Sequence, residues 1–191
     1  MKTLLIGSII LCCISLAAQA GELEITEITP LNYEVVELRT IFEEPNPYYV
    51  DRAYVITVVP DEVLEEIADK DAYWIKTGND DKHNADENQI TFEANANVWV
   101  YIAYDRRAAT PPPWVTEHYE DMGVNLSTSD IALGVWKSME EFPAGLVQLH
   151  GNDFGGATGA GSNYAAFVVM GSLYAVEASG KLSTTWGQLR K

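Results

Sequence analysis

Short runs of hydrophobic residues recur along the chain, and clusters of Asn, Asp, Gly and Pro separate them. The clearest run lies within residues 97–114, where a strongly apolar segment leads into a charged turn and three prolines. Alternate positions of this segment form two apolar sets, Val98, Val100, Ile102 and Tyr104 on one face and Trp99, Tyr101 and Ala103 on the other. Apolar side chains on both faces are typical of a central β-strand that is covered on both sides.

Similar runs of β-branched and aromatic residues predict about nine strands. These candidate strands are residues 22–29, 33–42, 53–59, 73–77, 89–94, 98–104, 132–137, 145–150 and 164–170. Short strands at this spacing predict an all-β protein, folded as an antiparallel β-sandwich of the jelly-roll type. Segment 61–69 is the exception, because its apolar residues have helical spacing. A short helix after Pro60 and a loop both fit this segment.

The first 20 residues have the pattern of a secretory signal peptide. Lys2 precedes an apolar run that ends near Leu16, and Ala18-Gln19-Ala20 fits a cleavage site. The run is shorter than the ~20 apolar residues of a membrane span, so we expect export with cleavage and no membrane span. The protein is then secreted, or held in a periplasm or on a cell surface.

Under this interpretation, residues 21–177 form one β-sandwich domain and residues 178–191 form a basic C-terminal tail. Both cysteines, Cys12 and Cys13, lie in the signal segment. Disulfides and thiolate metal sites are therefore excluded from the domain, which must be held together by its core.

The chain is acidic, with 12 Lys and Arg against 28 Asp and Glu and a formal net charge of −16. Such a surface repels nucleic acids, anionic lipids and polyuronate chains, so we predict no nucleic-acid partner. An acidic surface that serves only solubility is the alternative to any binding role. The tail is different, because Lys181, Arg190 and Lys191 accompany Trp186 there. It is either a docking peptide for a protein partner or a frayed terminus.

Two loops stand out by their composition. The almost wholly polar loop 78–88 carries enough oxygen-bearing side chains for a structural calcium ion, and a plain solvated turn is the alternative. The candidate calcium ligands are Asn79, Asp80, Asp81, Asp86 and Glu87. No other cofactor is required. The glycine-rich loop 151–162 lacks the spacing of a phosphate-binding loop, so we expect it to be a flexible hairpin connection.

Exposed aromatic residues are candidates for sugar binding, because a flat ring covers the apolar face of a pyranose. Pro111–Pro113 favour an extended polyproline conformation, and we expect them to hold Trp114 at the surface. Trp114, Tyr119 and Trp136 form the predicted platform, although Trp136 fits a core position equally well.

A charged turn follows the apolar strand, close to the predicted platform. Asp105 could accept hydrogen bonds from sugar hydroxyls, and Arg106 or Arg107 could donate them. Alternatively, Asp105 pairs with an arginine and stabilises the turn. The same two interpretations apply to Asp51 and Arg52.

Recognised catalytic motifs are absent from the sequence. His83, His118 and His150 lack the spacing of a zinc site, and no G-x-S-x-G motif supplies a serine nucleophile. Glu117, Glu120 and Asp121 could serve a glycosidase pair, but such neighbours arise by chance in so acidic a chain. We predict that the protein is not an enzyme.

A series of short motifs supports a family resemblance. In chain order they are Asp51-Arg52-Ala53-Tyr54, Pro60, Thr77 to Lys82, Val100 to Arg107, Pro113-Trp114, Phe142 to Gly145, Gly151-Asn152 and Tyr164. The series, within residues 51–170, resembles a β-sandwich accessory module of large secreted bacterial proteins, some of which degrade polysaccharides. The resemblance implies a non-catalytic, jelly-roll-like domain for carbohydrate binding or attachment. Because no catalytic domain accompanies it here, we expect a free-standing binding or envelope protein.

The leading hypothesis is therefore an exported, non-catalytic module that recognises a neutral polysaccharide or glycan through exposed aromatic residues. An extracellular or envelope structural protein, which binds other proteins and no sugar, is the alternative. A small glycan-cleaving enzyme is a third hypothesis, and it requires two carboxylates that face each other across a groove.

Overall fold

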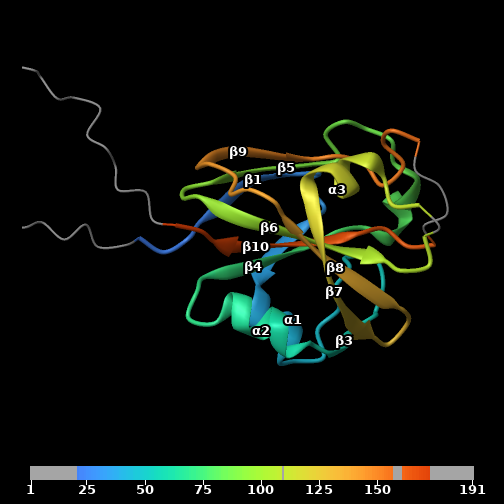
Figure 1. Cartoon of the computed structure of the whole chain (residues 1–191), viewed down its shortest axis with the longest axis horizontal. Coiled ribbons are helices and arrows are strands. Elements are labelled where there is room, and N and C mark those ends of the chain that lie inside the picture. The colour runs from blue at the N-terminus through green and yellow to red at the C-terminus, as the bar shows by residue number, and fades with distance from the viewer. Residues whose placement is uncertain (1–20, 109, 157–160, 173–191) are drawn as a thin grey trace, which may run out of the picture.

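A computed structural model describes residues 21–108, 110–156 and 161–172, and this part of the chain folds into two antiparallel sheets (Figure 1). The smaller sheet has the order β1 (Ile25–Thr29), β5 (Ile90–Ala94), β9 (Gly145–Leu149). The larger sheet has the order β2 (Glu34–Glu37), β4 (Ala72–Lys76), β10 (Ala165–Met170), β6 (Val98–Asp105), β8 (Ala132–Ser138), β7 (Tyr119–Thr128), β3 (Ile56–Val58). The prediction of an all-β, antiparallel sandwich is confirmed.

The larger sheet separates two hydrophobic cores. The first lies between the two sheets, and Val100 and Ile102 of β6 face it. The second lies on the other face, where Tyr101 of β6 stacks on Phe167 of β10 with ring centroids 4.5 Å apart, and Phe167 stacks on Trp74 at 5.8 Å. Strand β6 is therefore a central strand with apolar residues on both faces, as its sequence predicts.

Two short helices, α1 (Leu38–Phe42) and α2 (Asp61–Ile67), cover the second core, below the sheet in Figure 1. The predicted strand 33–42 is wrong in its second half, because the chain turns into α1 at Leu38. Helical spacing brings both Leu38 and Ile41 into the core, whereas a strand would bury only one of them. Segment 61–69 is helical as far as Ile67, so the first of its two interpretations, a short helix after Pro60, is confirmed.

Besides α1, the elements that were not predicted are strand β7, helix α3 (Pro113–His118) and a 3₁₀ helix at Asn79–His83. In β7 the pairing with β8 shifts between Asp121 and Asn125, around Gly123 with its positive φ of 72°. This irregularity interrupts the alternation of polar and apolar residues that reveals a strand. Helix α3 begins at Pro113, a position where proline is well tolerated because the first helical N–H has no partner within the helix.

None of the helices in the described part of the chain is long and apolar enough to cross a membrane. The predicted signal peptide, residues 1–20, and the predicted tail, residues 178–191, lie outside the described residues.

Candidate functional site

Helix α3 turns Trp114 into the first core. Its side chain is only 5% exposed, and its indole nitrogen Nε1 donates a hydrogen bond to the carbonyl oxygen of Gly151 at 3.0 Å. The ring meets Tyr119 and Tyr164 edge-on, at centroid distances of 5.7 and 5.4 Å. The expectation that three prolines hold Trp114 at the surface is therefore wrong. Pro112 is extended, as expected, but Pro113 starts a helix that directs the next side chain inwards.

The other two predicted platform rings do not form an exposed plane with Trp114. Tyr119 is buried, with 3% exposure, and burial raises the pKa of its hydroxyl above the ordinary value. Trp136 of β8 is partly buried, and the guanidinium carbon of Arg106 lies 6.0 Å from its ring centroid. The platform as predicted is therefore not present on the surface.

Asp105 ends strand β6 in a buried position, and its carboxylate accepts hydrogen bonds from several groups. Its carboxylate accepts hydrogen bonds from Nε and Nη2 of Arg107, at 2.9 and 2.8 Å, and from the backbone N–H of Gly161 at 3.0 Å. Burial opposes its ionisation, but the hydrogen bonds from Arg107 outweigh it, and the pKa of Asp105 lies below its usual value. The structural interpretation of this turn is correct, and the carboxylate is not accessible to a sugar.

Arg106 follows strand β6 and reaches across Gly134 of β8 to strand β7. Its guanidinium forms two hydrogen bonds with the carboxylate of Asp121, at 2.6 and 2.7 Å, and Nε donates to Asn125 at 2.7 Å. Gly134 makes room for this side chain, since a Cβ there would lie 2.1 Å from Nε of Arg106. Most of the guanidinium N–H groups of Arg106 and Arg107 that could bind a sugar thus already donate hydrogen bonds within the protein.

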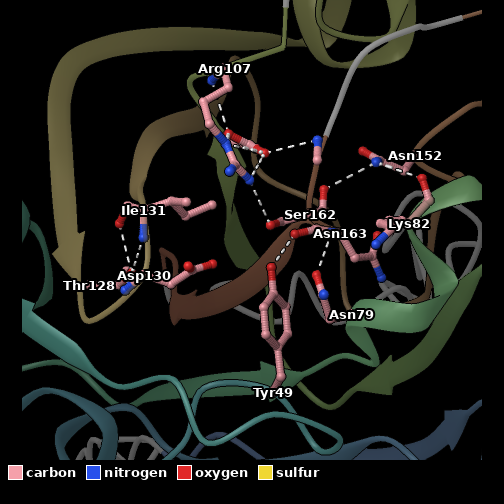
Figure 2. A network of polar contacts seen from close by, with 12 residues as sticks. Tyr49, Asn79, Lys82, Arg107, Thr128, Asp130, Ile131, Asn152, Ser162 and Asn163 are labelled. Atoms are coloured by element: carbon pink, nitrogen blue, oxygen red, sulfur yellow. Dashed lines mark hydrogen bonds and ion pairs between the residues drawn. The ribbon is translucent and has the colours of Figure 1, made fainter.

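A buried polar network holds both ends of the glycine-rich loop 151–162 (Figure 2). Asn152 is fully buried, and its amide nitrogen donates to the carbonyl oxygens of Lys82 and Ser162, at 2.9 and 3.3 Å. Asn163 donates to the carbonyl oxygen of Gly78 at 2.8 Å and accepts the hydroxyl of Tyr49 at its own carbonyl. These contacts anchor the described ends of the loop; residues 157–160, where flexibility was expected, lie outside the described residues.

Contacts within the protein engage three of the five predicted calcium ligands, and one of these, Asn79, belongs to the same network. Asn79 lies in the 3₁₀ helix η1 (Asn79–His83), where its side-chain oxygen accepts the N–H of Asn163 at 3.1 Å. Asp80 pairs with Arg52, and Asp81 accepts the hydroxyl of Tyr33 at 2.6 Å. In the described ranges no group of three or more His, Cys, Asp or Glu side chains could hold a metal ion.

A groove of about 570 Å³ lies between α3, the start of β7, the β8–β9 connection and β9; we call it the α3 groove. Its lining residues are Trp114, Glu117, His118, Tyr119, Ser138, Met139, Glu140, Glu141, Phe142, Pro143, Gln148 and His150. Trp114 and Tyr119 are almost completely buried, so they form its floor. Met139 is 54% exposed and offers apolar surface at the opening. Two of the three predicted aromatic residues, Trp114 and Tyr119, thus lie in one groove, where they support its floor and are not exposed to a ligand as a flat platform.

The rim of the α3 groove carries polar side chains that can bind hydroxyl groups. Glu117, Glu140 and Gln148 are exposed, and their oxygens and amide can accept and donate hydrogen bonds. Glu141 is already engaged, because Ser172 donates to its carboxylate from its N–H at 2.8 Å and from its hydroxyl at 2.5 Å. The volume is within the usual range for small-molecule sites, roughly 300–1,000 Å³.

Sequence patterns indicate only part of this groove. Met139 and Gln148 belong to no motif, whereas Trp114 and Phe142-Pro143 appeared among the motifs of the family resemblance. The groove forms because the β8–β9 connection lies beside α3, a helix that was not predicted.

Neither the protein-family models nor the curated proteins include a match to this chain. Among solved structures, the fold is similar to part of a β-glucuronidase from glycoside hydrolase family 2, with a TM-score of 0.57 and 19% sequence identity. The similarity covers 72% of this chain and only 13% of the enzyme chain. At this identity the similarity concerns the fold alone. The chain thus has the fold of a β-sandwich unit that also occurs within a much larger glycoside hydrolase.

Proposed function

We propose that this protein is an exported, non-catalytic β-sandwich module that binds a neutral glycan in the α3 groove. The observation that carries the proposal is the composition of that groove, where apolar surface at Met139 lies beside the exposed polar side chains Glu117, Glu140 and Gln148. A sugar ring presents the complementary pattern, with an apolar face and a hydroxyl-bearing edge. The fold similarity to a portion of a glycoside hydrolase supports a sugar-related role.

The charge of the groove favours a neutral ligand. Glu117, Glu140 and Glu141 line it, and its lining includes no lysine or arginine. Uronate chains would meet like charges both in the groove and across the surface, which lowers their affinity and their rate of association. Neutral hydroxyls, in contrast, can donate hydrogen bonds to these carboxylates.

The exposure of the carboxylates favours binding without cleavage. A glycosidase general acid needs an apolar, buried environment that keeps it protonated near neutral pH. Glu117 and Glu140 are exposed at the rim, and the carboxylate of Glu141 is held by Ser172 and Asn97. No acid of the required kind therefore lines the groove.

The test is a pull-down of the full chain on cellulose, chitin, xylan and mannan, with polygalacturonate as the charged comparison. Met139→Ala removes exposed apolar surface inside the groove, and Leu146→Ala removes a similar amount on β9 outside its lining, since the two side chains are 54% and 58% exposed. We expect binding to at least one neutral polymer that Met139→Ala weakens and Leu146→Ala leaves unchanged.

A second pair of variants examines the polar rim. Glu117→Gln together with Glu140→Gln keeps the shape of the groove but weakens its acceptors, so affinity for a neutral polymer should fall about tenfold, equivalent to roughly 1.4 kcal/mol. Equal binding by all variants would place the glycan site elsewhere. Lack of binding to every polymer would favour the structural, protein-binding alternative.

A further inference from the structure

A second, charged depression lies at the end of the sandwich where the described chain begins and ends. Two adjoining hollows, of about 570 and 510 Å³, share the lining residues Glu22, Asp69, Lys70 and Asp71. One continues to Gly171, near the end of the described chain, and the other continues to α1 and α2. We call the two hollows together the terminal groove. Figure 1 shows the first and last described residues at this same end of the molecule.

Negative charge dominates the terminal groove. Its acidic lining residues are Glu22, Glu37, Glu43, Asp69 and Asp71, and its basic ones are Arg39 and Lys70. Burial is the main reason why the pKa of the Tyr73 hydroxyl is raised, and the nearby carboxylates of Glu22 and Asp71 raise it further. This second contribution reflects the excess of negative charge. Leu64 adds an apolar element, since its side chain is 43% exposed at the same groove.

A basic segment follows this groove in the sequence. Gly171 lines it, and Ser172 is held in place by its hydrogen bonds to Glu141. The next 19 residues include Lys181, Arg190 and Lys191 in an otherwise acidic protein. Nineteen extended residues span at most roughly 60 Å, so the basic residues can return to a groove that begins beside their own attachment point.

We propose that residues 178–191 of this chain bind in its own terminal groove. The basic side chains of the segment pair with the carboxylates of Glu22, Glu37 and Glu43, and Trp186 covers the exposed part of Leu64. The segment and the groove complement each other in charge and in apolar character, and covalent attachment raises the effective concentration of the segment at the groove. This inference is independent of the glycan proposal, because the two grooves have no lining residue in common.

Carbodiimide coupling of the full chain tests the location of the segment, because it joins lysines only to carboxylates with which they are in contact. We expect Lys181 or Lys191 to couple to Glu22, Glu37 or Glu43 at low salt, and the yield to fall at 0.5 M salt as the ion pairs are screened. In an equal mixture of isotope-labelled and unlabelled chains, the products should join residues of one chain. Mixed products, products at Glu117 or Glu140, or the absence of products would overturn the proposal.

Trypsin cleavage after Lys181 in the full chain provides a second readout that does not depend on coupling. Glu22→Gln, Glu37→Gln and Glu43→Gln together should increase the rate of this cleavage about fivefold, since several exposed ion pairs are lost. Asp86→Asn, Glu87→Gln and Glu120→Gln remove the same number of charges outside the terminal groove and form the matched control. Equal cleavage rates in the two triple variants would refute the assignment.

Discussion

The indole of Trp114 donates its hydrogen to the carbonyl oxygen of Gly151, and this bond links α3 to the first residue of the glycine-rich loop. Gly151 is itself enclosed, because a Cβ at this position would lie 2.3 Å from the carbonyl oxygen of Asn84. The hydrogen bond from Trp114 and the close approach of Asn84 to Gly151 together connect three segments that are distant in the sequence. It gives Trp114 a structural role beneath the α3 groove, where a ligand-binding role was expected.

Trp114→Phe tests this role by keeping an aromatic ring while removing the N–H donor. The carbonyl oxygen of Gly151 is then left without this partner, and we expect the free energy of unfolding to fall by about 1–3 kcal/mol. Trp136→Phe is the control, because Trp136 is only partly buried. Urea denaturation compares the two variants. A loss for Trp136→Phe as large as that for Trp114→Phe would contradict the role of the indole hydrogen bond.

Asp105→Asn should change how stability depends on pH. The pKa of Asp105 is lowered in the folded protein, chiefly because hydrogen bonds from Arg107 outweigh the effect of burial. The stabilisation by the charged carboxylate is therefore fully present above the pKa of an unfolded aspartate, about 3.9, and is lost as the pH falls through the lower folded value. We expect the variant to be less stable than the wild type by roughly 1.5–3 kcal/mol at pH 7.

The difference between the wild type and Asp105→Asn should shrink steadily below pH 4. Denaturation at a series of pH values measures it, and Asp86→Asn, at an exposed position, should differ little from the wild type throughout. A difference for Asp105→Asn that stayed constant from pH 7 to pH 2.5 would rule out the charge of Asp105 as its origin.

Tyr48 and Tyr49 offer a matched comparison in the second core. Their rings lie 4.4 Å apart and both are buried, but only the hydroxyl of Tyr49 has a partner, the carbonyl of Asn163. The hydroxyl of Tyr48 has no hydrogen-bond partner within the described residues. We expect Tyr49→Phe to cost about 1–2 kcal/mol of stability and Tyr48→Phe to be neutral or stabilising. Thermal unfolding would refute this expectation if the two variants were equally destabilised.

Calcium removal should leave the protein unchanged. The side-chain oxygens of Asn79, Asp80 and Asp81 are engaged by Asn163, Arg52 and Tyr33, and these contacts compete with any ion. A ligand that binds only the folded state raises the melting temperature, so EDTA and added Ca²⁺ should both leave the midpoint where it is. A midpoint that falls with EDTA and recovers with Ca²⁺ would restore the sequence-based hypothesis.

The residues of β6 were sufficient to predict a central strand of a sandwich, because a strand that is buried on both faces has apolar residues at successive positions. Strand β7 is harder to predict, since a register shift near Gly123 interrupts its alternation of polar and apolar residues. Turn chemistry also allowed two outcomes at Asp105, and the hydrogen bonds of Arg107 decide between them.

The candidate site could not be predicted to the same degree. The three prolines before Trp114 fit an exposed extended segment and the start of a helix equally well in local terms. Contacts with residues distant in the sequence, such as Gly151 and Tyr164, bury the ring and favour the helix. The α3 groove depends on these long-range contacts, so the sequence pointed to Trp114 and Tyr119 but not to the groove that they support.

The position of β6 between two cores also bears on how the protein unfolds. Val100 and Tyr101 are neighbours in sequence but belong to different cores. A slip of the strand by one residue would exchange the contents of both cores at once, so the pairing of β6 with β10 is strongly specified. We therefore expect the two cores to unfold together. Fluorescence changes at Trp74 and Trp114, on opposite faces of the sheet, should therefore follow one cooperative transition.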